Sequence, residues 1–207
     1  MPAMFLSAYN DLVLNLKNTL KEVHLKFLDG SDNSGLIEHF NGFKELETTN
    51  VELCLKDSHL TTLDSLLNTR EKFVALSMQC KVDKNTDYSI SKWFDSNREY
   101  KKLPSLSFLK ARDSHSLEYA VKKFESIKKA QVALVHLDRK PDDPIIILQQ
   151  HMDMLDMLKN IPDFQFTFMS YANCEDLGEK LLEYAGLDKS SLKAGKYYTT
   201  VTVRKHH

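Results

Sequence analysis

Hydrophobic and polar residues alternate along several short stretches of the chain, and this pattern predicts strands with one buried face. In residues 72–82, for example, Val74, Leu76 and Met78 fall on one side and more polar residues on the other. By this alternation, or by a short β-branched or apolar run, we expect six strands, over residues 50–56, 72–82, 131–138, 144–149, 163–170 and 196–204.

Apolar residues three and four positions apart predict helices between these strands. The clearest such pattern covers residues 2–28, which predicts a long N-terminal amphipathic helix that ends at Asp29 and Gly30. Further helices are expected from Asp57 or Ser58 to Asn68, within 88–100, from Asp113 or Ser114 through Ile127, over 150–160, and from Asn173 to Tyr184. Residues 101–112 show little periodicity and are expected to form an exposed connection.

Strands that alternate with helices favour an α/β fold with a mixed, mostly parallel sheet flanked by helices. The strands at 131–138 and 144–149 are too close in sequence for a crossover helix, so they would pair as a hairpin and make the sheet mixed. An α+β fold is the alternative. We expect a single globular domain over residues 1–207, with the helix of residues 1–28 packed on it.

Composition narrows the class of protein. The chain has 207 residues, of which 42% are hydrophobic and 28% charged, and this balance suits a globular core. It contains no apolar run of membrane-spanning length and no secretory leader, so we expect a soluble intracellular protein, cytoplasmic or nuclear, without a membrane partner. The final His206 and His207 are typical of a purification tag and enter no functional argument.

The turn between the two most apolar stretches carries the first candidate site. It offers imidazole and carboxylate groups that suit Mg, Mn or Zn, namely His136, Asp138, Asp142, Asp143 and His151. Strand ends are also where α/β sheets commonly place their sites. An ordinary tight turn needs the same Pro and Asp residues, so a solvated turn is the alternative interpretation.

Asp138, Arg139 and Lys140 end a hydrophobic strand, and this spacing is similar to the D-x-K element of restriction-endonuclease-like nucleases. The resemblance implies that Asp138 holds a divalent ion and that Lys140 positions or activates water. Such sites also need an acidic residue upstream, for which Asp83 or Asp87 would serve. The long helical insertion between them and the strand departs from the compact arrangement of those enzymes.

Cys174 is a third catalytic candidate, because it follows a predicted strand at the expected start of a helix. A helix N-terminus lowers the pKa of a thiol and favours a nucleophile. A cysteine hydrolase would need a histidine nearby, which His136 or His151 would supply. The alternative is a small residue tolerated in the first turn of a helix.

A run of basic residues is the candidate surface for single-stranded nucleic acid. Its members are Lys110, Arg112, Lys122, Lys123, Lys128 and Lys129, interleaved with Tyr100, Phe108 and Tyr119 that would stack on bases. From Lys189 onward the chain carries five basic residues and no acid, whereas residues 141–188 carry ten acids and two lysines. These blocks also suit partner surfaces or internal pairing, and a sequence pI near 6.7 is low for a dedicated nucleic-acid binder.

The glycine-rich motifs that cradle nucleotide phosphates are missing, so a nucleotide bound in that way is not expected, although helix N-termini bind phosphate without such a motif. The pattern favours a regulatory or adaptor α/β module that acts through a protein partner. A divalent-metal-dependent enzyme that acts on nucleic acid or a phosphoester, and a single-stranded nucleic-acid binder, are the alternatives. Whether the chain is an enzyme, and its oligomeric state, stay open.

Overall fold

The computed structural model describes residues 16, 19–27, 43, 45–69, 74–81, 88–96, 100–136, 144–170, 175–184, 186, 192–195 and 198–205. The chain groups into two compact units, residues 1–103 and residues 104–207. The single domain expected from the sequence stays a prediction. No helix among the described residues is long and apolar enough to cross a membrane.

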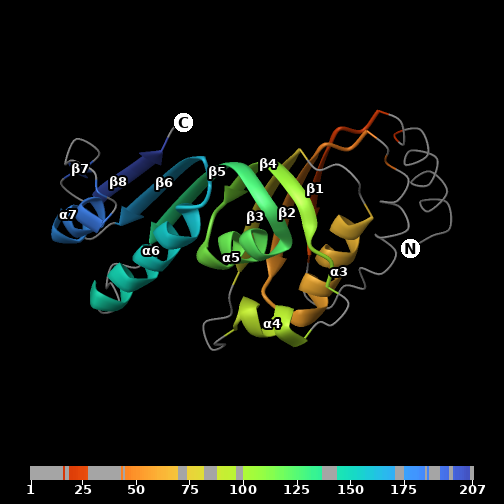
Figure 1. The fold of residues 1–207 in the computed structure, drawn as a ribbon, viewed down its shortest axis with the longest axis horizontal. Coiled ribbons are helices and arrows are strands. Elements are labelled where there is room, and N and C mark those ends of the chain that lie inside the picture. The colour runs from red at the N-terminus through yellow and green to blue at the C-terminus, as the bar shows by residue number, and fades with distance from the viewer. Residues whose placement is uncertain are drawn as a thin grey trace, which may run out of the picture. The chain divides into compact units, whose positions relative to one another are not determined.

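Three parallel strands lie in the described part of the first unit. β1 (Glu22–Lys26) pairs with β2 (Thr48–Cys54), and β2 pairs with β3 (Ala75–Lys81). Helix α3 (Asp57–Asn68) links β2 to β3, and α4 (Ile90–Ser96) follows β3 (Figure 1). A helix between two parallel strands is the crossover that this pairing requires.

One face of these three strands is mostly apolar and buried. Val51 and Leu53 on β2 alternate with half-buried polar residues, as do Leu76 and Met78 on β3. Helix α3 contributes the buried side chains Leu60, Leu63, Leu66 and Leu67 to the core of the unit. The alternation that predicted these strands therefore reflects the burial of one face.

Charged residues occupy the opposite face of the same sheet. Glu52 lies 3.6 Å from the ammonium of Lys26 and also forms an ion pair with Lys81. The contact with Lys81 is the main cause that lowers the pKa of Glu52. Asn50 donates to Glu22 at 2.5 Å, so neighbouring strands are also joined by polar side chains.

The strands described in the second unit are β4 (Leu103–Ala111), which enters the unit at its second residue, β5 (Phe124–His136), β6 (Asp163–Ser170), β7 (Leu192–Gly195) and β8 (Tyr198–Lys205). Their order across the sheet is β4-β5-β6-β8-β7. β5 and β6 are parallel, whereas β8 is antiparallel to both β6 and β7. Three helices accompany the sheet, α5 (Ser114–Lys123), α6 (Pro144–Leu158) and α7 (Glu175–Tyr184) (Figure 1). The mixed, mostly parallel α/β fold is confirmed.

The expected strand at 144–149 is wrong, because these residues form the first turns of α6. Pro144 is the first residue of this helix, where its fixed φ and its missing N–H are tolerated. The isoleucines after it suggested a strand, but propensity alone does not override helix packing. The sheet is mixed because β8 runs antiparallel, and no hairpin follows β5.

Other boundaries also differ from the sequence interpretation. Residues 101–112 form β4 rather than an exposed connection. The predicted helix over 1–28 is wrong at its end, where residues 22–26 form β1, and residues 1–15 lie outside the described part of the chain. The helix expected to run to Ile127 ends at Lys123, so Phe124 and Ile127 are buried in β5 instead.

Several local signals are confirmed. α3 ends at Asn68 and β6 covers residues 163–170, as the pattern predicted. Asp113 caps α5, because its carboxylate accepts from the backbone N–H of Ser116 at 2.8 Å. Gly186 follows α7 with a φ of 70°, the left-handed conformation that commonly terminates a helix.

Candidate functional site

Most candidates for metal binding and catalysis follow one of two neighbouring parallel strands, β5 and β6, in the sequence. β5 ends at His136, whose backbone is in register with that of Ser170 at the end of β6. The carboxyl ends of these two strands therefore lie at the same edge of the sheet. Asp138, Lys140, Asp142, Asp143 and Cys174 follow these strands in the sequence and lie outside the described residues, as do Asp83 and Asp87.

His151 is the one candidate ligand whose side chain is described, and it lies in the core. It is on α6, is 1% exposed, and its ring contacts Phe168 edge-on with centroids 4.3 Å apart. Phe166 contacts the same ring at 5.9 Å. These contacts give His151 a packing role between α6 and β6. Among the described residues, no group of three or more His, Cys, Asp or Glu could hold a metal ion.

The six basic candidates do not form one surface on a single helix. Lys122 and Lys123 belong to α5, whereas Lys128 and Lys129 belong to β5 and Lys110 to β4. The basic candidates are therefore spread over one helix, two strands and the residue after β4. Arg112 is exposed and follows the end of β4.

The six basic candidates also differ in burial and in ion pairing, so only some of them are available to a ligand. Lys123 is fully buried, and Lys129 lies 2.9 Å from Asp163 on the neighbouring strand. Tyr119, which was expected to stack on bases, is also fully buried. Lys128 is exposed, and no ion pair of its ammonium occurs within the described ranges. The stacking surface expected from the sequence is therefore not available at Tyr119.

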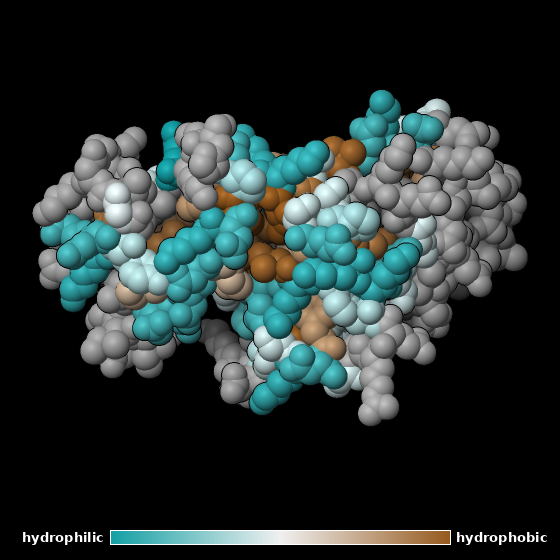
Figure 2. Space-filling model, in the orientation of Figure 1, coloured by the Kyte–Doolittle hydropathy of each residue, from teal (hydrophilic) through white to brown (hydrophobic). Residues whose placement is uncertain are grey.

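A hollow in the second unit was not anticipated from the sequence. Its volume is about 210 Å³, and its apolar wall combines the end of α5, the start of β5 and the end of α6. The apolar residues that line it are Val121, Phe124, Ile127, Met157, Ile161 and Pro162, and the polar ones are Glu125, Ser126, Lys128 and Asn160. Figure 2 shows hydrophobic atoms reaching the surface around β5 and α5, among hydrophilic side chains.

The start of β5 departs from the regular pleat beside this hollow. Phe124, Ile127 and Ala130 are buried three positions apart, and only from Ala130 onward does every second residue become buried. A strand with one covered face buries every second residue, so burial in this stretch does not follow the alternation of the rest of β5. Glu125, Ser126 and Lys128 are all exposed to solvent here. The spacing of three also hid this part of β5 from the sequence analysis.

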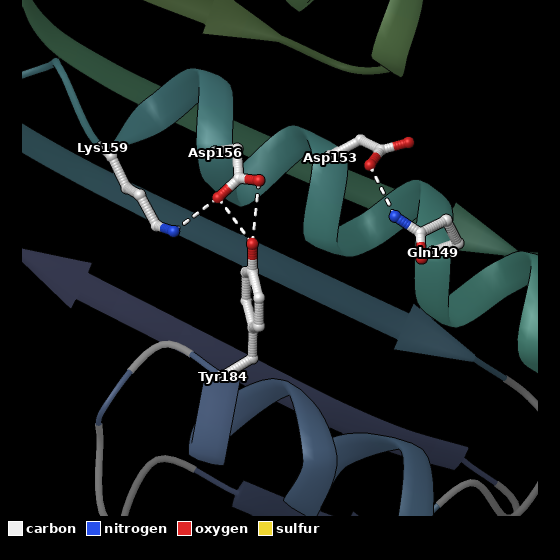
Figure 3. A network of polar contacts seen from close by, with 5 residues as sticks. All are labelled: Gln149, Asp153, Asp156, Lys159 and Tyr184. Atoms are coloured by element: carbon white, nitrogen blue, oxygen red, sulfur yellow. Dashed lines mark hydrogen bonds and ion pairs between the residues drawn. The ribbon is translucent and has the colours of Figure 1, made fainter.

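A polar cluster joins α6 to α7 on the surface of the same unit (Figure 3). The carboxylate of Asp156 accepts from the hydroxyl of Tyr184 and lies 2.5 Å from the ammonium of Lys159. Lys159 also lies over the Tyr184 ring, 4.6 Å from its centroid. Lys159, and then Tyr184, lowers the pKa of Asp156, while Asp156 is the main cause that raises the pKa of Tyr184 and of Lys159.

This cluster stabilises the contact between two helices and does not resemble a reaction centre. Its three residues satisfy one another on an exposed surface, and none of them lines the hollow. No signal in the sequence links Asp156 to Tyr184, because they lie on different helices. The hollow is therefore the feature of the described residues best suited to bind another molecule.

Comparison with protein families, with curated proteins and with solved structures finds no match to this chain.

Proposed function

We propose that this chain is a regulatory or adaptor α/β module that binds a protein partner at the hollow formed by α5, β5 and α6. The observation that carries the proposal is the apolar wall of this hollow, which is open to solvent and rimmed by exposed charges. Central apolar contacts surrounded by a polar rim are the usual anatomy of a protein interface.

The size of the hollow supports a protein ligand over a cofactor. Its volume of about 210 Å³ lies below the roughly 300–1,000 Å³ of pockets that enclose drug-sized ligands. It suits a single large side chain, and one buried anchor side chain often dominates the binding energy of an interface.

Site-specific photo-crosslinking in the native cell tests this proposal. Met157 and Met152 are both half-buried residues of α6, but only Met157 lines the hollow. A photo-reactive amino acid at position 157 should capture a defined partner, while the same group at position 152 should not. The captured protein is then purified and its affinity for the chain is measured by calorimetry.

The matched variants complete this test. Met157→Lys places a charge in the apolar wall, and we expect it to weaken binding at least about tenfold, a change of roughly 1.4 kcal/mol. Met152→Lys should leave the affinity unchanged. Equal affinity of the two variants, or equal crosslinking from both positions, would show that the hollow is not the interface.

A divalent-metal-dependent enzyme is the second candidate. The observation that favours it is the register of His136 with Ser170, because it places the carboxyl ends of the parallel strands β5 and β6 at one edge of the sheet. Ligands in α/β sheets commonly bind at the carboxyl ends of the strands. The candidate groups are His136, Asp138, Asp142 and Asp143, with Lys140 between them in the sequence and Cys174 in the segment that follows β6.

A further inference from the structure

The first residues of β5 extend beyond the neighbouring strand β6. Pairing between the two strands begins at Lys129 and Asp163, although β5 itself begins at Phe124. Residues 125–128 thus precede the paired stretch and form one side of the hollow. Their backbone groups that point toward the β6 side have no strand partner within the described part of the chain.

The residues before β6 do not continue the ladder. The N–H of Ile161 donates to the carbonyl of Leu158 at 2.9 Å, which turns the chain back toward the end of α6. Pro162 has no N–H and cannot donate to a neighbouring strand. The space beside residues 125–128 is therefore bordered by a strand edge on one side and by the apolar end of α6 on the other.

Exposed charged side chains lie at both ends of the edge formed by residues 125–128. Glu125 and Lys128 are exposed, and neither forms an ion pair within the described residues. Elsewhere in this unit, by contrast, Lys129 is paired with Asp163 and Lys159 with Asp156. A ligand that carries one acid and one base would complement the two rim charges.

We propose that the hollow takes an extended segment of the partner protein, which pairs with residues 125–128 of β5 and inserts one large aliphatic or aromatic side chain. The inference rests on the proposed function and names its mode of binding. In this mode, backbone hydrogen bonds to an exposed strand edge provide affinity, and a side-chain pocket provides specificity. The acid and the base of the segment flank the inserted side chain and contact Lys128 and Glu125.

Synthetic peptides test this mode with the full chain. The probes are acetyl-Thr-Asp-Thr-Leu-Thr-Lys-Thr-amide and the peptide with Asp and Lys exchanged, because the direction of the added strand decides which one pairs both charges. Binding is measured by isothermal titration calorimetry and mapped by amide NMR shifts. We expect at least one peptide to bind and to shift residues 125–128, and to weaken about tenfold or more when Leu becomes Ala, which exposes the apolar wall.

Two controls separate the strand edge from the apolar hollow. The same peptide with N-methyl groups on alternate residues keeps its side chains but cannot pair as a strand, so one of the two N-methyl registers should lose binding. Met157→Lys should also lose binding, while Met152→Lys should retain it.

The outcomes distinguish the two proposals. Undiminished binding of both N-methylated registers would overturn strand addition and leave the hollow as the interface. Absence of binding by every peptide would also overturn the inference, whereas the crosslinking result at Met157 and Met152 stands independently for the proposed function. Shifts confined to other parts of the chain would place the peptide elsewhere and contradict the inference.

Discussion

The hydroxyl of Tyr184 on α7 lies 2.7 and 2.8 Å from the two carboxylate oxygens of Asp156 on α6. This contact raises the pKa of Tyr184 above 10.0 because the nearby carboxylate disfavours a phenolate. Lys159 lowers the pKa of Tyr184, and Asp156 is the main cause of the net rise.

Asp156→Asn should lower the pKa of Tyr184, because the substitution removes the carboxylate charge that is the main cause of its rise. The pKa is measured from the tyrosine ring carbons by NMR as pH rises. Asp153→Asn is the matched control, since Asp153 lies on the same helix but accepts from Gln149 at 2.8 Å. A pKa of Tyr184 that is unchanged in Asp156→Asn would contradict the assigned cause.

The same contact predicts the direction of a pH effect on stability. The pKa of Asp156 is lower in the folded chain than its ordinary 3.8, so ionised Asp156 favours the folded state. Its contribution is complete above the unfolded value and is lost as pH falls through the lower folded pKa. Urea unfolding of the parent and Asp156→Asn should therefore differ most at neutral pH and converge in acid, and a constant difference would contradict this.

Asp113→Ala should destabilise the second unit by about 1 kcal/mol, the usual cost of losing a helix N-cap. The carboxylate of Asp113 accepts from the N–H of Ser116 at 2.8 Å and from the Ser116 hydroxyl at 2.7 Å. Asp113→Asn should retain most of the stability, because an amide oxygen still accepts a hydrogen bond. Denaturant midpoints measure the difference, and equal losses in both variants would argue against capping.

Phe168→Ala should cost about 3–5 kcal/mol, because it removes a buried ring that contacts His151. The only tryptophan, Trp93, lies in the first unit, so its fluorescence follows the unfolding of that unit alone. If the chain is the single domain expected from the sequence, Phe168→Ala will shift the Trp93 transition together with the loss of helix seen by circular dichroism. A Trp93 transition that stays in place would show that the two units unfold independently.

Metal addition separates the two candidate functions. We expect the melting temperature after EDTA treatment to be unchanged by millimolar Mg, Mn or Zn, because the favoured function needs no metal. A ligand at one hundred times its dissociation constant stabilises a fold by about 2.7 kcal/mol, which is easily measured. A rise with metal that disappears in Asp138→Asn, but persists in the control Asp153→Asn, would favour the metal-dependent enzyme.

Strands that bury every second residue were predicted from the alternation of apolar and polar residues. Phe164, Phe166 and Phe168 alternate along β6, and the bounds of that strand follow directly. Capping by Asp113 and the stop at Gly186 are also local, because each depends on a few neighbouring residues. Such local signals can be recognised in the sequence without knowledge of the tertiary structure.

Strands that do not bury every second residue were missed, because their spacing of apolar residues is not specific to a strand. β4 buries Leu103, Leu106 and Leu109, a spacing that does not distinguish a twisted strand from an irregular segment. β1 is only five residues long, and Val23 fits a helical stripe as well as a strand. The hollow was invisible in the sequence because it depends on two helices and a strand that meet only in the folded unit.

The position of β8 between β6 and β7 has a consequence for synthesis on the ribosome. β6 leaves the ribosome well before residues 198–205 are made, and until then its outer edge lacks the antiparallel partner that covers it in the native sheet. An uncovered strand edge rich in phenylalanine is a template for pairing between nascent chains. Translation that stalls between β6 and β8 would thus release a chain prone to aggregate, and the rate of elongation through this interval becomes part of how the protein reaches its fold.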